Sequence, residues 1–203
     1  RPAYGWVGEE SEPVEGTDAR RRWIVDPLDG TTNFLHGLPH WAISIAMEHK
    51  DEVVAAVIYD PVKDELFAAE KGGGAWMNGK RIRVSNRKDL SECLFATGVP
   101  FGAKKTLGMT TKDLIALMPT CAGVRRMGAA SLDLAYVAAG RYDGYWEREL
   151  QPWDIAAGVL LVREAGGLVN DFDGADDWRR SGELIAATPK VHHEMLQVMK
   201  PLS

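Results

Sequence analysis

The segment of residues 26–34 constrains this chain most, because it joins two carboxylates to a rigid proline and a glycine turn. It reads Asp-Pro-Leu-Asp-Gly-Thr-Thr-Asn-Phe and follows the largely apolar residues 22–25. Such a run is typical of a buried strand, and Pro27 favours an extended conformation at Asp26. The first carboxylate is therefore predicted at the end of a strand, and the Asp-Gly pair that follows favours a sharp turn.

A helical turn at residues 31–33 would place free backbone amides beside these two carboxylates. The first amides of a helix have no partner within it and form an anion site. Carboxylate, carbonyl and hydroxyl oxygens are hard ligands that favour magnesium, manganese or calcium over zinc or copper. The segment thus predicts a place where a phosphate meets its cations, with magnesium as the default. A plain turn is the alternative, but the full combination of residues disfavours it.

Residues 23–34 closely resemble the metal-binding signature of the inositol monophosphatase family. Two further segments resemble that family's other motifs. Residues 8–11, Gly-Glu-Glu-Ser, look like its upstream acidic motif, and residues 151–158, Gln-Pro-Trp-Asp-Ile-Ala-Ala-Gly, look like its downstream signature. Because the three segments follow the family's order across almost the whole chain, the sequence is identified as a member of that family.

The resemblance implies an α+β fold with the layered α/β/α/β/α architecture of the sugar phosphatases. The family carries N-terminal helices upstream of the acidic motif, and they are absent from the given chain, which begins at Arg1. We expect residues 1–203 to form a single inositol monophosphatase-like domain. Two lobes, with a boundary at about residue 120, are the alternative that the length allows.

The resemblance also implies a site for two magnesium ions. Without cations, the carboxylates of such a site would repel one another, by about 4 kcal/mol for a pair 4 Å apart at an effective dielectric near 20. Cations are therefore needed to hold the cluster together, and without them at least one carboxyl pKa is expected to rise. The implied metal ligands are Glu9, Asp26, the Leu28 backbone carbonyl, Asp29 and Asp154.

The implied reaction is direct hydrolysis of a phosphate ester. Glu9 and the Thr31 hydroxyl would orient the attacking water and help to deprotonate it, so that it attacks phosphorus in line without a covalent phosphoenzyme. Asp29 would join them as a third catalytic residue and accept a hydrogen bond from a substrate hydroxyl. The predicted catalytic residues are Glu9, Asp29 and Thr31.

The resemblance places the substrate between the metal motifs and residues 125–131, which look like the family's polyol-binding turn. Ala129 stands where many members carry threonine or serine, which removes a hydrogen bond worth about 0.5–1.5 kcal/mol. Glu147 lies seven positions before Asp154, as in the family, and is expected to bind substrate hydroxyls. The predicted substrate contacts are Asp29, Gly30, Thr31, Thr32, Gly128, Ala129, Ala130, Glu147 and Asp154.

The leading prediction is a magnesium-dependent, lithium-sensitive hydrolase that releases phosphate from myo-inositol monophosphate. One alternative keeps the chemistry and changes the substrate to histidinol phosphate, a sugar phosphate or a nucleotide phosphate. Another alternative, from a different class, is a regulatory member of the fold that binds protein or RNA. The resemblance also suggests a homodimer.

The composition agrees with such an enzyme. The formal charge of −5 and the pI near 5.6 make nucleic acid an unlikely partner. The Arg20-Arg21-Arg22 triplet is expected to be a solvated loop. Cys93 and Cys121 have no metal-ligand spacing and indicate reduced thiols in the cytoplasm. We find no apolar run long enough to cross a membrane.

Three other segments are predicted to be turns or loops and not sites. Residues 171–177 are acidic but have neither the glycine position nor the terminal glutamate of a calcium loop. His36 and His40 are separated by glycine and proline, which disfavours a zinc site. Residues 72–74 are three glycines without the Lys-Ser or Lys-Thr of a P-loop, and a flexible turn is expected there.

Hydrophobic alternation, turn residues and helix signals divide the rest of the chain into elements. Helices are expected at residues 111–118, 130–139 and 153–165, and after residue 189. Strands are expected at residues 41–47, 53–59, 65–70, 81–84, 94–97, 142–146, 168–169 and 183–187.

Overall fold

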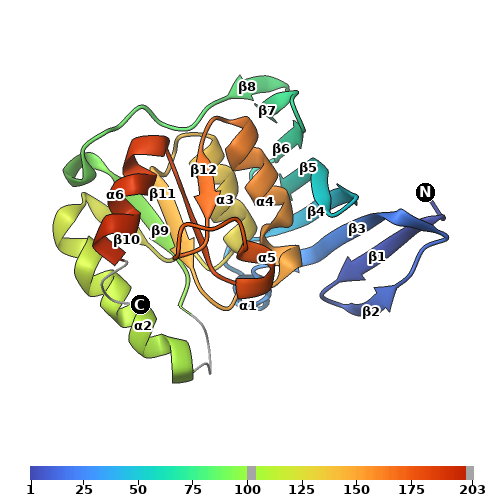
Figure 1. Ribbon diagram of the computed structural model, residues 1–203, viewed down its shortest axis with the longest axis horizontal. Helices are drawn as coiled ribbons and strands as arrows, with labels where there is room; N and C mark the ends of the chain where they lie inside the picture. The colour runs from blue at the N-terminus through green and yellow to red at the C-terminus, as the bar shows by residue number, and fades with distance from the viewer. Residues whose placement is uncertain (100–103, 200–203) are drawn as a thin grey trace.

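Two β-sheets enclose a pair of helices in the computed structural model, which describes residues 1–99 and 104–199 (Figure 1). The larger sheet forms one side of the molecule, and the smaller sheet packs against the opposite side of the helix pair. Two further helices cover the outer face of the smaller sheet. The layers therefore run β/α/β/α, and the α+β class predicted from the sequence is confirmed.

The larger sheet has eight strands in the order β2-β1-β3-β4-β5-β6-β7-β8. All neighbours are antiparallel except β1 and β3, which are parallel. Alternate residues of β4 are buried against the helices, as expected for a strand with one face in the core. The strands are β1 (Tyr4–Gly8), β2 (Ser11–Val14), β3 (Asp18–Asp29), β4 (Ala42–His49), β5 (Glu52–Asp60), β6 (Glu65–Glu70), β7 (Gly74–Met77) and β8 (Lys80–Ile82).

The smaller sheet has five strands in the order β10-β9-β11-β13-β12. Strand β9 pairs in parallel with β10 and β11, whereas β13 is antiparallel to β11 and β12. The strands are β9 (Leu94–Thr97), β10 (Gly123–Arg125), β11 (Gly144–Glu147), β12 (Leu168–Asn170) and β13 (Leu184–Ala187).

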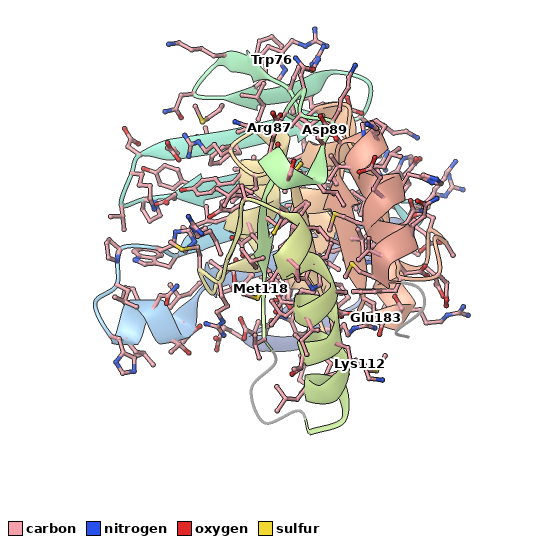
Figure 2. The ribbon with its side chains drawn as sticks, turned by 90° about the vertical axis from the view of Figure 1, so that its left-hand side faces the viewer. Trp76, Arg87, Asp89, Lys112, Met118 and Glu183 are labelled. Atoms are coloured by element: carbon pink, nitrogen blue, oxygen red, sulfur yellow. The ribbon has the colours of Figure 1, made fainter. Side chains whose placement is uncertain are left out.

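Helices α3 (Ala130–Ala138) and α4 (Pro152–Glu164) lie between the sheets, and every residue of α3 is buried. Helix α6 (Pro189–Met199) packs on the smaller sheet, and α2 (Lys104–Leu117) packs on α6. Figure 2 shows α2 at this outer face, with the exposed Lys112 on it and the exposed Met118 directly after its end. The short helices are α1 (Thr31–Leu35), α5 (Trp178–Ser181), η1 (Leu90–Glu92) and η2 (Met118–Thr120). Among the described residues, no helix is both long and apolar enough to cross a membrane.

The predicted elements are found, and the structure adds the strands β7 and β10 and the short helices α5, η1 and η2, which were not expected. The hairpin of β1 and β2 was not expected, and α2 begins at Lys104, seven residues earlier than predicted. The segment Arg20–Arg22 is part of β3, which begins at Asp18, and not a loop, although Arg20 and Arg22 are exposed to solvent as predicted. The Arg22 Nε lies 2.5 Å from Oε1 of the buried Glu48 on β4, so this part of β3 is fixed by an ion pair across the sheet.

The turn predicted at residues 72–74 is present, and hydrogen bonds to the end of α4 hold it. The Glu164 carboxylate at the end of α4 accepts hydrogen bonds from the Gly72 amide at 2.7 Å and the Gly74 amide at 2.8 Å. The amides that would bind a phosphate thus bind a side chain of the protein itself. The acidic segment 171–177 is a turn, as predicted, in which Asp171 accepts hydrogen bonds from the amides of Asp173 and Ala175.

Close packing of α3 on α4 depends on Gly158. A Cβ placed on Gly158 would lie 2.5 Å from the Cβ of Leu134, which is completely buried on α3. Because neither atom is at the end of a flexible side chain, the helices themselves would have to move apart. This contact holds the helix pair between the two sheets.

Gly158→Ala is expected to lower the free energy of unfolding by about 1–3 kcal/mol, as overpacked cores do. Gly108→Ala on α2 is the matched control, since a Cβ placed there would lie within 4 Å of no described atom other than its chain neighbours and the backbone of its own helix. That control is expected to be neutral or stabilising by about 0.5–1 kcal/mol. Denaturant unfolding of both variants measures the difference, and equal stabilities would contradict the packing argument.

Candidate active site

An irregularity in β3 brings Asp26 and Asp29 to the same side of the sheet. Residues three apart in a regular strand face opposite sides. Here Asp26 pairs with Ser44 of β4 and Asp29 with Ala42, so two residues of β3 stand opposite one of β4. This bulge turns the second carboxylate back to the side of the first. Both side chains are buried, with exposed fractions of 1% and 8%.

Glu9 reaches the same place from the turn between β1 and β2. Strand β1 runs parallel to β3 with Gly8 beside Val25, so the next residue along, Glu9, lies next to Asp26. A Cβ on Gly8 would come within 2.9 Å of the Val25 carbonyl oxygen, so glycine allows this close approach. Glu9 is exposed, unlike the aspartates.

Asp154 comes from the first turn of α4, as predicted. Its Oδ2 accepts a hydrogen bond from the Gln151 amide at 2.7 Å, which caps the start of the helix. The Ser44 hydroxyl on β4 donates to the Trp153 carbonyl at 3.3 Å, which ties the helix start to the larger sheet. The helix therefore carries Asp154 to the end of β3, where Asp26 and Asp29 lie.

Each aspartate has one oxygen fixed by the protein. Asp26 Oδ1 accepts from the Leu28 amide at 2.8 Å, and Asp29 Oδ2 accepts from the Ser131 amide at 2.8 Å and its hydroxyl at 2.5 Å. Within the described residues, the second oxygen of Asp29 and of Asp154 accepts no hydrogen bond from the protein. The side chains are thus oriented, and these oxygens remain available to a ligand.

Burial raises the pKa of all three aspartates to about 7. The charge of Asp29 raises the pKa of Asp26 further, and the charges of Asp154 and Glu9 raise that of Asp29. The hydrogen bonds from Leu28, Ser131 and Gln151 act in the opposite direction, because they stabilise the charged forms. Burial of negative charge therefore dominates the electrostatics of the site.

These side chains share one hollow of about 170 Å³ with α1 and the segment before α3. Gly30, with φ of +91°, makes the turn that places α1 here, and the Thr31 hydroxyl donates to the Leu28 carbonyl at 3.0 Å. The hollow is lined by Glu9, Asp26, Leu28, Asp29, Gly30, Thr31, Thr32, Asn33, Arg126, Gly128 and Asp154.

The described part of the chain contains no group of three or more His, Cys, Asp or Glu side chains already arranged to hold a metal ion. The predicted metal ligands thus line one hollow without forming a closed cluster. Among the described residues, His36 and His40 likewise belong to no such group.

Three predicted substrate contacts do not line this hollow. Ala129 and Ala130 are buried at the start of α3, with exposed fractions of 1% and 9%. Glu147 ends β11, where its Oε2 accepts a hydrogen bond from the Tyr145 hydroxyl at 2.5 Å. Burial raises the pKa of Glu147 to about 7, and the charge of Asp29 contributes to this rise, so Glu147 lies near the carboxylates without sharing their hollow.

The sequence analysis assigned no role to four residues that shape the site. Ser131 holds Asp29, and the buried Asn33 donates to the carbonyls of His40 and Met127, both at 2.8 Å. Arg126 lines the hollow and brings the positive charge of a guanidinium to it. Asp133 is buried on α3, and burial with the charge of Glu147 raises its pKa well above the ordinary value. Local patterns give no signal for contacts between segments this far apart.

Comparisons with known proteins agree with the geometry. The sequence pattern of the "Inositol monophosphatase family" matches residues 2–199. "Inositol-1-monophosphatase" of Rhizobium meliloti is 51% identical over 98% of this chain and 75% of its own length. "Nus factor SuhB" of Escherichia coli is 49% identical over 98% of this chain and 74% of its own length. The solved structure of inositol monophosphatase from Anabaena superposes with a TM-score of 0.95 at 38% identity, over 100% of this chain and 80% of that one.

In EDTA, Asp29→Asn is expected to stabilise the protein at pH 8 but not at pH 5. The pKa of Asp29 is about 7 in the folded protein against 3.8 ordinarily, so the folded state binds more protons between these values. The contribution of Asp29 to stability therefore falls as the pH rises from about 4 to 7. An asparagine stays neutral, and its carbonyl still accepts from Ser131, so a gain of about 1–3 kcal/mol is expected at pH 8.

Denaturant unfolding at the two pH values measures this effect. Asp173→Asn, at an exposed position, is the control and should change stability little at either pH. A loss of stability in Asp29→Asn at pH 8 would contradict the raised pKa.

Proposed function

Because the chain belongs to the inositol monophosphatase family, a family of phosphatases, we propose that the hollow hydrolyses a small polyol phosphate with magnesium. The leading substrate is a myo-inositol monophosphate. One observation carries the proposal: carboxylates from three separate parts of the chain line a single hollow together with a backbone carbonyl and a hydroxyl. These groups are Glu9, Asp26, Leu28, Asp29, Thr31 and Asp154.

The donor set fits hard divalent cations. All the proposed ligand atoms are carboxylate or carbonyl oxygens, which magnesium prefers. Burial raises the pKa of Asp26, Asp29 and Asp154 to about 7, so each charged form lacks a compensating positive charge. Divalent cations would supply that charge and draw together side chains that otherwise repel. When bound, magnesium would polarise the phosphate and make water a stronger nucleophile.

The residues of this chain would then orient the substrate and move the proton. Glu9 is exposed at the edge of the hollow, where its carboxylate would accept the proton of the attacking water. The Thr31 hydroxyl already donates to the Leu28 carbonyl, so its oxygen is free to accept a hydrogen bond from the same water. The first amides of α1, at Thr31 and Thr32, would bind phosphate oxygens.

The polyol would lie toward Gly128 and Glu147. Gly128 lines the hollow with a φ of +81°, and Arg126 beside it brings a positive charge that suits an anionic substrate. Asp29 and Glu147 would accept hydrogen bonds from substrate hydroxyls. Lithium inhibition and a homodimer stay predictions of the family resemblance, and a cytoplasmic location stays a prediction from the two cysteines.

The same chemistry on histidinol phosphate, a sugar phosphate or a nucleotide phosphate is the alternative within the family. A second role in binding a protein or RNA is favoured by one observation, the name "Nus factor" of the 49% identical Escherichia coli relative. Such binding would survive Asp29→Asn, whereas hydrolysis would not. The net charge of −5 makes a broad nucleic-acid surface the weaker expectation.

Phosphate release from a panel of esters tests the proposal. The panel holds inositol 1-phosphate, histidinol phosphate, fructose 1,6-bisphosphate and a nucleotide phosphate, each with magnesium or EDTA. We expect inositol 1-phosphate to be preferred, EDTA to abolish turnover, and Asp29→Asn and Glu9→Gln to lower kcat by about 100-fold or more.

Glu10→Gln is the matched control for Glu9→Gln, because it makes the same change one residue away and outside the hollow. It should keep wild-type turnover. Preference for another ester would change the substrate but keep the mechanism. A folded, magnesium-loaded protein that hydrolyses none of the panel would refute the catalytic proposal.

A further inference from the structure

Glu147 is held on one side by a buried tyrosine. Tyr145 precedes it by two residues on β11, so both side chains point to the same face of the smaller sheet. Tyr145 is completely buried, and its hydroxyl donates to Glu147 Oε2 at 2.5 Å. A buried hydroxyl needs a partner, and a bond to a carboxylate is stronger than one between neutral groups. This bond therefore fixes the orientation of the Glu147 carboxylate.

On the other side, Glu147 lies over Gly98. Strands β9 and β11 are parallel, with Tyr145 beside Ala96 and Trp146 beside Thr97. The next residues in the direction of these strands are Glu147 and Gly98, so these two are neighbours as well. The Thr97 hydroxyl donates to the Trp146 carbonyl at 2.7 Å and ties the two strand ends together.

A Cβ on Gly98 would lie 1.8 Å from Glu147 Oε1 and 2.0 Å from Oε2. The carboxylate thus occupies the space that any side chain at position 98 would fill. The φ of Gly98 lies outside the left-handed region, so glycine is needed here for space and not for backbone conformation.

We propose that Gly98 and Tyr145 are positioning residues that fix the Glu147 carboxylate and thereby set a preference for polyol phosphates over phosphate esters without hydroxyls. The proposal rests on the function proposed above. A glutamate side chain has several rotatable bonds, and fixing it in advance removes the cost of ordering it when substrate binds. With Oε2 held by Tyr145, Oε1 keeps its capacity to accept a substrate hydroxyl. An ester without hydroxyls offers Glu147 no partner and gains nothing from this arrangement.

Gly98→Ala is a selective probe because the new Cβ would clash with the carboxylate of Glu147, which is the end of a flexible side chain. The Glu147 carboxylate can rotate away, whereas the backbone and the carboxylates of the hollow need not move. The variant should therefore fold and keep the proposed metal ligands while it loses the position of Glu147. Tyr145→Phe removes the same restraint from the other side, with almost no change in volume.

Steady-state kinetics with magnesium test this on inositol 1-phosphate and on 4-nitrophenyl phosphate. For Glu147→Gln and Gly98→Ala we expect the KM for inositol 1-phosphate to rise about tenfold, because one hydrogen bond between the substrate and a charged group is lost. For Tyr145→Phe we expect a rise of about threefold. The kcat/KM for 4-nitrophenyl phosphate should stay within about twofold of wild type in Gly98→Ala and Tyr145→Phe, because that ester makes no contact with Glu147.

Gly108→Ala and Tyr59→Phe are the matched controls, since Gly108 has open space around it and the Tyr59 hydroxyl bonds to Asp64 far from the hollow. Both should keep wild-type discrimination between the two esters. A crystal structure of Gly98→Ala should show the Glu147 carboxylate turned away from residue 98.

The possible failures are distinguishable. Wild-type discrimination in Gly98→Ala and Tyr145→Phe, with loss in Glu147→Gln, would overturn the positioning role and leave Glu147 as a substrate contact. Wild-type discrimination in all three variants would overturn the role of Glu147 as well. A wild-type protein that hydrolyses neither ester would overturn the proposed function, and the positioning role with it.

Discussion

Burial of like charge is the constraint on which the candidate site depends. Three aspartates lie in the protein with pKa values raised to about 7, and each is held in place by a backbone amide. The amides fix where the carboxylates point but do not neutralise them. A folded chain of this kind holds an unfavourable electrostatic energy that a bound cation would relieve. Folding, proton binding and cation binding are therefore coupled at this site.

The rest of the fold holds these charges close together. Four parts of the chain meet where β3 ends. They are the end of β3 itself, the turn after β1 and the first turns of α3 and α4. Ser131 links α3 to Asp29, and Asn33 links α1 to the segment before α3. Apart from Glu9, which lies on a turn, the carboxylates of the site come from the ends of a strand and a helix whose other parts are buried in the core, so their geometry follows from packing.

Much of this arrangement could be predicted from the sequence because its signals are local. The strand into Asp26, the turn at Gly30 and the helix carrying Asp154 each follow from a proline, a glycine or a capping residue nearby. The β1–β2 hairpin was missed because all four residues of β2 are exposed and show no alternation. The start of α2 was missed because Gly108 and a run of threonines weaken the helical pattern there. The contacts of Ser131 and Gly98 join distant segments and become visible only in three dimensions.

The bulge in β3 makes the length of the motif as important as its chemistry. Pro27 and Leu28 stand opposite a single residue of β4, so Asp29 faces the side of Asp26 although the two are three positions apart. Loss of either residue would restore a regular strand with Asp29 still on the side of Asp26, but it would remove the bulge in which the Leu28 amide donates to Asp26 and the Leu28 carbonyl accepts from Thr31. During divergence, this segment would therefore tolerate exchanges of side chains more readily than insertions or deletions. A search for proteins with the same site should weight the Asp-x-x-Asp spacing above the identity of the residues between.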